Sequence, residues 1–214
     1  MSKSQYKLRR AEAFFELVYP VFSEHFDGGY RIVEFCAGNG NAGRLFATQS
    51  DVQAVTFVDI KKVRDLEATL RDVGDKGNFF LEGIDHYNIP ANSGVIAIHA
   101  CGPLTDKILK KTALAGVPVA VMTCCHRGES EMYNLQNPPN PRLLNYVKRE
   151  DYLDTVRKQF LVEQRYDATI AKIDSKITPF NNVIIGVPRV SVEDTGQINV
   201  EVMKMRESAS PRIK

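Results

Sequence analysis

A glycine-rich turn at the end of a short apolar run contains the first residues of this sequence that could bind a ligand. The run over 32–35 includes Glu34, and Gly38 and Gly40 follow it before a helical pattern begins at Ala42. Glycine suits such a turn because the backbone must change direction sharply and come within contact of a ligand. A strand, a glycine turn and a helix start in this order predict the opening unit of a nucleotide-binding α/β domain.

Two acidic residues extend this prediction. Asp59 ends the next apolar run, about 20 residues beyond the turn, where a carboxylate can accept hydrogen bonds from both hydroxyl groups of a ribose. Glu34 lies inside the first run, where a carboxylate would repel a pyrophosphate but suits a cofactor with a positively charged amino acid end. A buried glutamate bound by backbone N–H groups beside an ordinary turn is the alternative interpretation.

Polar residues also follow the later predicted strands, and ligands of open α/β sheets lie at the carboxyl ends of the strands. Asp85 follows the third strand, where it could accept a hydrogen bond from the exocyclic amine of adenine or stabilise a turn. The candidates after the fourth and fifth strands are His99, Cys101, Cys124, Cys125, His126 and Arg127. Among them, His126 is the candidate general base, because imidazole titrates near the working pH, and a structural histidine is the alternative.

The cysteine and histidine residues of this set do not predict a metal site. Zinc is usually bound by these residue types, but the C-x-x-C spacing is missing, and Cys124 and Cys125 would point to opposite faces of a continuing strand. We therefore expect no metal. A cysteine nucleophile and a buried structural cysteine are the alternatives for these thiols.

The composition predicts an ordinary globular chain. Its 214 residues are 43% hydrophobic and 25% charged, and the net charge of +2 is too small to indicate a nucleic-acid-binding protein by itself. We expect one domain over 1–190, in which 1–29 form a helix that covers the sheet, and a polar tail over 191–214 that could add an edge strand. No apolar run approaches about 18 residues, so we expect no membrane span.

The location predicted from the sequence is a reduced, cytoplasmic one. The four cysteines lie in strand-like or strand-end segments rather than in a loop-rich framework. The first five residues lack the apolar core of a secretion signal.

Hydrophobic periodicity predicts alternating helices and strands. We expect helices over 4–26, 42–49, 61–72, 103–114 and 142–159, and strands over 32–35, 54–59, 78–82, 94–100, 117–122, 161–170 and 182–187. The expected inward residues of the first and third helices are Leu8, Ala11, Phe15, Val18, Phe22, Val63, Leu66 and Leu70. The alternation predicts an α/β fold with a mostly parallel, seven-stranded sheet and helices on both faces.

Three motifs resemble those of a known family. Glu34, Gly38 and Gly40 form a Glu-x-x-x-Gly-x-Gly pattern that resembles motif I of class I S-adenosylmethionine (SAM) methyltransferases. The segments 99–106 (H-x-C-G…T-D) and 124–126 (C-C-H) look like signatures of the methyltransferase group that contains the eukaryotic tRNA acceptor-stem 2′-O-methyltransferases. The resemblance covers roughly residues 30–130, and the absence of a helix between the last two strands fits the antiparallel seventh strand of the methyltransferase sheet.

The sequence departs from this pattern at three points. Cys36 stands where motif I usually has its first glycine, and Arg127 stands where a second histidine often follows C-C-H. The zinc-binding segments of the tRNA enzymes are absent.

The resemblance implies a Rossmann-like SAM-dependent methyltransferase that acts on RNA, either tRNA or rRNA. The residues implied for SAM binding are Glu34, Ala37, Gly38, Asn39, Gly40, Asp59, Ile60, Asp85 and His99. The residues implied for the acceptor side are Cys101 and His126 as catalytic groups and Cys124, Cys125 and Arg127 as substrate contacts. A non-catalytic SAM- or RNA-binding module and an NAD(P)-dependent oxidoreductase are the alternative functions.

Overall fold

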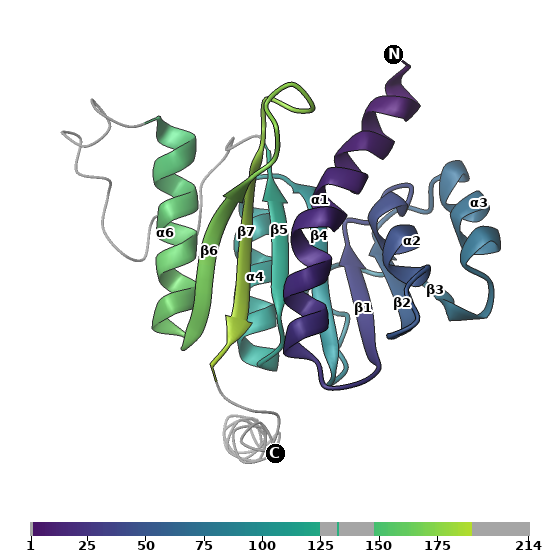
Figure 1. Ribbon diagram of the computed structural model, residues 1–214, viewed down its shortest axis with the longest axis horizontal. Helices are drawn as coiled ribbons and strands as arrows, with labels where there is room; N and C mark the ends of the chain where they lie inside the picture. Colours follow the sequence, from purple (N-terminus) through teal and green to yellow (C-terminus); the bar gives the residue numbers. More distant parts are fainter. Residues whose placement is uncertain (1, 125–131, 133–147, 190–214) are drawn as a thin grey trace, which may run out of the picture.

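The computed structural model describes residues 2–124, 132 and 148–189, and a seven-stranded sheet lies at its centre (Figure 1). The strand order is β3-β2-β1-β4-β5-β7-β6, and the neighbours pair in parallel except at β7, which is antiparallel to β5 and β6. The strands are β1 (Tyr30–Phe35), β2 (Val52–Asp59), β3 (Gly77–Leu81), β4 (Ser93–Ala100), β5 (Val119–Thr123), β6 (Tyr166–Lys172) and β7 (Asn182–Pro188). The predicted mostly parallel, Rossmann-like sheet is confirmed.

Helices cover both faces of the sheet. The described helices are α1 (Lys3–His25), α2 (Asn41–Ala47), α3 (Arg64–Val73), α4 (Pro103–Ala115) and α6 (Arg149–Glu163), with a short 3-10 helix η1 (Gly74–Lys76) before β3. Alternate strand residues face opposite layers, so Ile32 packs in the core beneath α1, α2 and α3, whereas Val33 packs in the core beneath α4 and α6. Both faces are thus apolar, as expected for a mostly parallel sheet.

Helix α1 buries a slightly different stripe from the predicted one. Ala11, Val18 and Phe22 are buried as expected, but Phe14 is fully buried in place of Phe15. Phe15 lies at the margin of the core, where its ring meets that of Phe46 edge-on with centroids 5.0 Å apart. The helix packs on α2 and lies across the sheet in front of β4 (Figure 1).

Two predicted boundaries are wrong. Helix α3 begins at Arg64 rather than at residue 61, and Val63 is its exposed N-cap rather than an inward residue. Helix α6 continues to Glu163, so 161–163 are helical, and Leu161 is buried as part of the helix. The predicted helix residues 142–147 and the tail over 191–214 lie outside the described residues.

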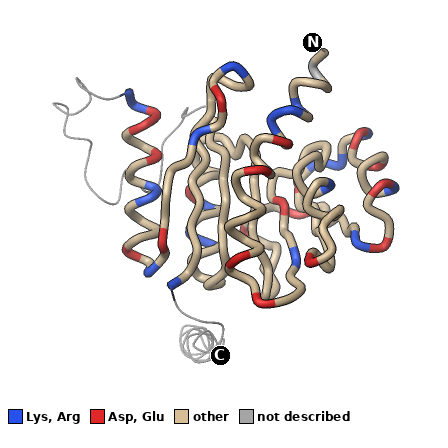
Figure 2. Tube along the Cα trace, viewed as in Figure 1, with Lys and Arg blue, Asp and Glu red and all other residues tan. Residues whose placement is uncertain are grey.

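The surface of the described helices carries mixed charge. Figure 2 shows basic and acidic residues interleaved along α3 and α6, whereas α1 is basic toward its N-terminus and acidic further along. Within the described ranges, no helix combines the length and the apolar character that a membrane crossing requires.

Candidate functional site

The glycine turn after β1 adopts left-handed backbone conformations. Gly38 has φ +52° and Gly40 has φ +69°, and the Gly40 N–H donates to the Ala37 carbonyl at 2.8 Å before α2 begins. Cys36, which stands in place of a motif I glycine, also has a positive φ of +53°. The substitution thus keeps the glycine-like backbone at a position that disfavours a side chain.

Asp59 connects this turn to the end of β2. Its Oδ2 accepts the Gly38 N–H at 2.9 Å, and its Oδ1 accepts the Lys61 N–H at 3.2 Å. On the far side of the turn, Thr69 Oγ1 of α3 donates to the Asn39 carbonyl at 2.7 Å. Asp59 does not cap a helix at Lys61, because α3 begins three residues later. Its carboxylate oxygens keep further acceptor capacity for a ligand.

Glu34 is a buried carboxylate directly beneath the turn. It is 3% exposed, and its Oε2 accepts the Gly43 N–H at 2.8 Å. A Cβ at Gly43 would lie 2.7 Å from that oxygen, so only glycine allows this approach. Burial raises the pKa of Glu34 to about 8, with a smaller contribution from Asp59, and the Gly43 hydrogen bond opposes the shift.

The backbone bond at Glu34 matches the alternative interpretation from the sequence, but one neutral donor does not compensate a buried charge. No Lys or Arg within the described residues forms an ion pair with this carboxylate. A bound cation would therefore favour the charged form of Glu34.

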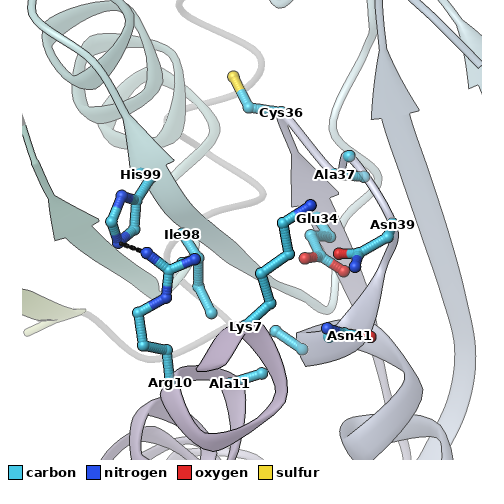
Figure 3. Close-up of a pocket in the computed structure, with 12 residues that line it drawn as sticks. Lys7, Arg10, Ala11, Glu34, Cys36, Ala37, Asn39, Asn41, Ile98 and His99 are labelled. Carbon is cyan, nitrogen blue, oxygen red and sulfur yellow. Dashed lines mark hydrogen bonds between the residues drawn. The ribbon is translucent and has the colours of Figure 1, made fainter. Parts of the chain in front are cut away.

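A pocket of about 170 Å³ opens between the glycine turn, β4 and α1 (Figure 3). Five of the predicted residues line it: Glu34, Ala37, Gly38, Asn39 and His99. The sequence reasoning missed the residues that α1, α2 and β4 contribute: Lys7, Arg10, Ala11, Asn41, Ala42 and Ile98. The amphipathic pattern predicted α1, but it gave no sign that the basic residues of this helix reach the carboxyl ends of the strands.

Arg10 and His99 form a polar pair on the wall of the pocket. Arg10 Nη1 lies 2.9 Å from His99 Nε2, and the Arg10 guanidinium stacks over the Tyr6 ring at 4.9 Å (Figure 3). Burial, together with Arg10, lowers the pKa of His99 to about 4, so the imidazole is neutral and Nε2 accepts. The Arg10 Nε is buried and has no hydrogen-bond partner within the described residues.

The other predicted SAM residues, Gly40, Asp59, Ile60 and Asp85, do not line this pocket. Ile60 and Asp85 lie on the exposed edge beyond β2 and β3. Ile60 is 70% exposed. Asp85 pairs with Lys107 of α4 at 2.6 Å, and the hydrogen bond from Lys107 lowers the pKa of Asp85.

Cys101 and Cys124 follow neighbouring strands and meet beside the pocket. Their Sγ atoms are 2.6 Å apart. The other acceptor-side candidates, Cys125, His126 and Arg127, lie outside the described residues. Among the described residues, no three His, Cys, Asp or Glu side chains are grouped as a metal site.

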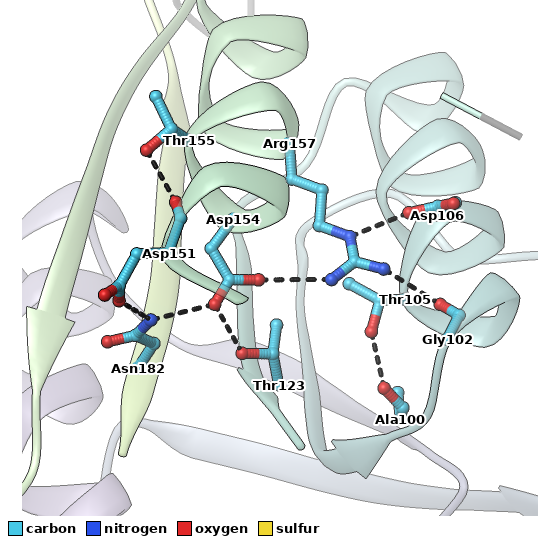
Figure 4. A network of polar contacts seen from close by, with 10 residues as sticks. All are labelled: Ala100, Gly102, Thr105, Asp106, Thr123, Asp151, Asp154, Thr155, Arg157 and Asn182. Atoms are coloured by element: carbon cyan, nitrogen blue, oxygen red, sulfur yellow. Dashed lines mark hydrogen bonds and ion pairs between the residues drawn. The ribbon is translucent and has the colours of Figure 1, made fainter. Parts of the chain in front are cut away.

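A buried polar network holds the segment 100–106, which includes Cys101, in place (Figure 4). Arg157 of α6 is 1% exposed and donates from Nε to Asp106 at 2.8 Å and from Nη2 to the Gly102 carbonyl at 3.1 Å. Thr105 Oγ1 donates to the Ala100 carbonyl at 2.5 Å. The T-D pair of the H-x-C-G…T-D motif is therefore structural. Sequence reasoning missed Arg157 because it lies 51 residues from Asp106.

A family model described as a methyltransferase domain matches residues 6–131. The chain belongs to this methyltransferase family. The human Glutathione S-transferase C-terminal domain-containing protein is 25% identical, and the alignment covers 85% of this chain but 33% of the relative. The chain thus spans about one third of the length of the curated relatives it matches.

Two solved methyltransferase structures share the fold of this methyltransferase domain. The magnesium protoporphyrin IX methyltransferase of Synechocystis PCC 6803 with bound SAH has a TM-score of 0.58 and 11% identity, covering 88% of each chain. A 23S rRNA methyltransferase has a TM-score of 0.53 and 11% identity, covering 89% of this chain and 70% of the other. The fold is that of the class I methyltransferases, whose cofactor is SAM.

The pocket of the methyltransferase domain fits SAM in three respects. The buried Glu34 carboxylate suits the ammonium group of the cofactor, and the positive charge of Arg10, which also lines the pocket, suits its carboxylate. The left-handed glycine turn lets the backbone approach a ligand closely.

Proposed function

We propose that this domain transfers a methyl group from SAM to an RNA. The observation that carries the cofactor assignment is the opposition of Glu34 and Arg10 across one pocket. Glu34 would bind the ammonium group, Arg10 the carboxylate and Asp59 the ribose. The cofactor would contact the backbone of the glycine turn at Ala37, Gly38, Asn39 and Gly40. His99 would hold Arg10 in place.

SAM supplies a methyl group on a sulfonium, which an acceptor oxygen or nitrogen can displace in line. The protein contributes chiefly by holding the two reactants together, which can be worth about 7–11 kcal/mol. We assign the general base to His126 and the acceptor wall to Cys101, Cys124 and Cys125. Arg127 would bind a substrate phosphate.

The RNA acceptor is supported by the charge of α1 at the mouth of the pocket. Lys7 and Arg9 are exposed on this helix, and Lys7 extends over the pocket on the side of Glu34 and Asn39 (Figure 3). The ammonium group of Lys7 at this rim, and the exposed guanidinium of Arg9 elsewhere on the helix, can neutralise backbone phosphates. The rRNA methyltransferase with the same fold is consistent with this acceptor class.

We also place the domain in a reducing, cytoplasmic compartment. Cys36, Cys101 and Cys124 are thiols rather than disulfide partners, although the last two sulfurs lie in contact. A reducing compartment would keep that pair as thiols.

Binding to a short RNA hairpin at rising salt tests the acceptor class. Neutralising a phosphate releases counterions, so the dissociation constant should increase steeply between about 50 and 200 mM salt. A Lys7→Gln/Arg9→Gln double variant should lower the slope of log affinity against log salt by about one to two. Lys172→Gln, a change of an exposed lysine on the edge strand β6, is the control and should leave the slope unchanged.

RNA binding that is absent, or indifferent to salt in this range, would refute the RNA acceptor. It would favour a small-molecule or protein acceptor and would leave the SAM site unaffected.

A further inference from the structure

Two thiols meet where the parallel strands β4 and β5 end. These strands are hydrogen-bonded neighbours, and Cys101 and Cys124 are the residues that immediately follow them. Their Sγ atoms are 2.6 Å apart. A disulfide bond is about 2.05 Å long, so the sulfurs need to approach by only about half an ångström to form one.

The interior holds both cysteines in this position. The Gly102 carbonyl, next to Cys101, accepts from Arg157 Nη2 at 3.1 Å. The Thr123 hydroxyl, next to Cys124, donates to Asp154 at 2.8 Å. Arg157 and Asp154 are themselves paired at 3.1 Å (Figure 4). One buried ion pair therefore holds the Gly102 carbonyl on one side of the sulfur contact and the Thr123 side chain on the other.

The two cysteines differ in access and in electrostatic surroundings. Cys101 is partly exposed, whereas Cys124 is 4% exposed. The Arg10 guanidinium interacts electrostatically with Cys124. A reagent can thus reach Cys101, and Cys124 is the buried sulfur placed to attack it.

We propose that Cys101 and Cys124 form a reversible disulfide that is oxidised by hydrogen peroxide and reduced by a dithiol. The Cys101 thiolate attacks one peroxide oxygen, the O–O bond breaks, and a sulfenic acid and hydroxide form. The Cys124 thiolate then attacks the Cys101 sulfur, the S–O bond breaks and hydroxide leaves. Two thiols lose two electrons, and with their two protons the peroxide becomes two waters. A dithiol reverses the oxidation by exchange.

The proposal rests on the proposed function only for its effect on methyl transfer. The disulfide would close the acceptor wall that we assign to Cys101, Cys124 and Cys125. Thiol chemistry can be followed without any methyl acceptor, so failure of the disulfide and failure of the methyltransferase assignment are separate results.

Thiol titration and peptide mapping of the peroxide-treated full chain test the proposal. Trypsin cuts after Lys107, Lys110 and Lys111, so the bond would join peptide 77–107 to peptide 112–127. The second peptide also contains Cys125, so the mapping is repeated in Cys125→Ser. We expect the loss of two of the four thiols, a cross-link in both the wild type and Cys125→Ser, and recovery of the thiols with dithiothreitol.

Cys36→Ser is a matched control, because it removes another thiol near the pocket and should leave the cross-link in place. Cys101→Ser and Cys124→Ser should each abolish it. Four intact thiols after treatment of the wild type, or a cross-link that survives in Cys124→Ser, would overturn the proposal.

Discussion

Two sets of buried carboxylates in this domain are stabilised in opposite ways. Asp106 and Asp154 lie between α4, α6 and the sheet, and both accept hydrogen bonds from the buried Arg157. Glu34 is equally buried, but it accepts a hydrogen bond from the backbone N–H of Gly43 and not from a cation. The negative charges of Asp106 and Asp154 are compensated by Arg157 of the protein itself. Glu34 lies on a pocket wall, where a cationic ligand can compensate its charge.

A buried carboxylate that lacks a cationic partner can therefore indicate a ligand site. A buried ion pair fixes neighbouring segments, and here it holds the Gly102 carbonyl next to Cys101 and the Thr123 side chain next to Cys124. A buried acid without a cation costs stability in the free protein. The protein keeps such a group where binding can offset the cost, so we expect variants of the two sets to change different measurements.

The largest expected effect is on the compensated set. Arg157→Leu would leave two buried carboxylates without their guanidinium, and the free energy of unfolding should fall by about 3–5 kcal/mol in urea titrations. Arg189→Leu is the matched control, because it breaks an Arg–Asp pair that is half-exposed, and it should cost less than about 1 kcal/mol. Equal losses in the two variants would contradict the structural role of Arg157.

The next effect concerns Asp59, which we place at the ribose. Asp59→Ala should weaken SAM binding by roughly 10- to 150-fold, because hydrogen bonds to a charged acceptor are worth about 1.5–3 kcal/mol. Asp59→Asn should lose less, since the amide oxygen still accepts one bond. Calorimetric titration and a melting curve are measured together. A variant that melts lower yet binds SAM as tightly as the wild type would limit Asp59 to holding the turn at Gly38.

The uncompensated carboxylate of Glu34 should make the stability of the free protein depend on pH. Burial raises the pKa of Glu34 from 4.5 to about 8 in the folded protein, so between these values the folded state holds a proton that the unfolded state has released. The stabilising contribution is complete below the unfolded pKa and is lost as the pH rises through the folded one. The melting temperature of the free wild type, relative to Glu34→Gln, should therefore fall from about pH 5 to about pH 8.

The same substitution should weaken SAM binding by about 10-fold, because the amide cannot pair with an ammonium group. If the difference in melting temperature between the wild type and Glu34→Gln did not change with pH, and the SAM affinity were unchanged, Glu34 would not be an uncompensated carboxylate at the cofactor site.

The smallest effect is expected at Asp85, the predicted adenine contact. Its side chain is 61% exposed and already paired with Lys107, so Asp85→Ala should weaken SAM binding by only about 3- to 5-fold. Lys107→Met breaks the same pair and should not weaken the binding. Unchanged affinity in Asp85→Ala would remove Asp85 from the cofactor site.

The sequence predicted the sheet well because strand identity depends on local patterns. The apolar runs ending at Phe35, Asp59 and Ala100 are strands, and the order of elements implied an antiparallel last pair. Boundaries failed where a local pattern was ambiguous. Val63 continues the helical spacing of Leu66 and Leu70, but the turn between Asp59 and Lys61 delays the helix to Arg64.

The site was predictable only in the part that is contiguous in sequence. Glu34 and the glycine turn belong to one motif, and Asp59 lies at a typical distance from it. Arg10 meets His99 across 89 residues, and Arg157 meets Gly102 across 55. No local periodicity encodes such contacts, because they depend on how α1 and α6 pack on opposite faces of the sheet.

The position of Arg157 in the chain bears on how the domain is made. The glycine turn, Asp59 and the ends of β4 and β5 are synthesised before α6. A nascent chain that stops short of Arg157 carries the whole cofactor motif but lacks the guanidinium that fixes Gly102 and Asp154. Because domains generally fold as units during synthesis, the final arrangement of Cys101 and Cys124 awaits translation of α6.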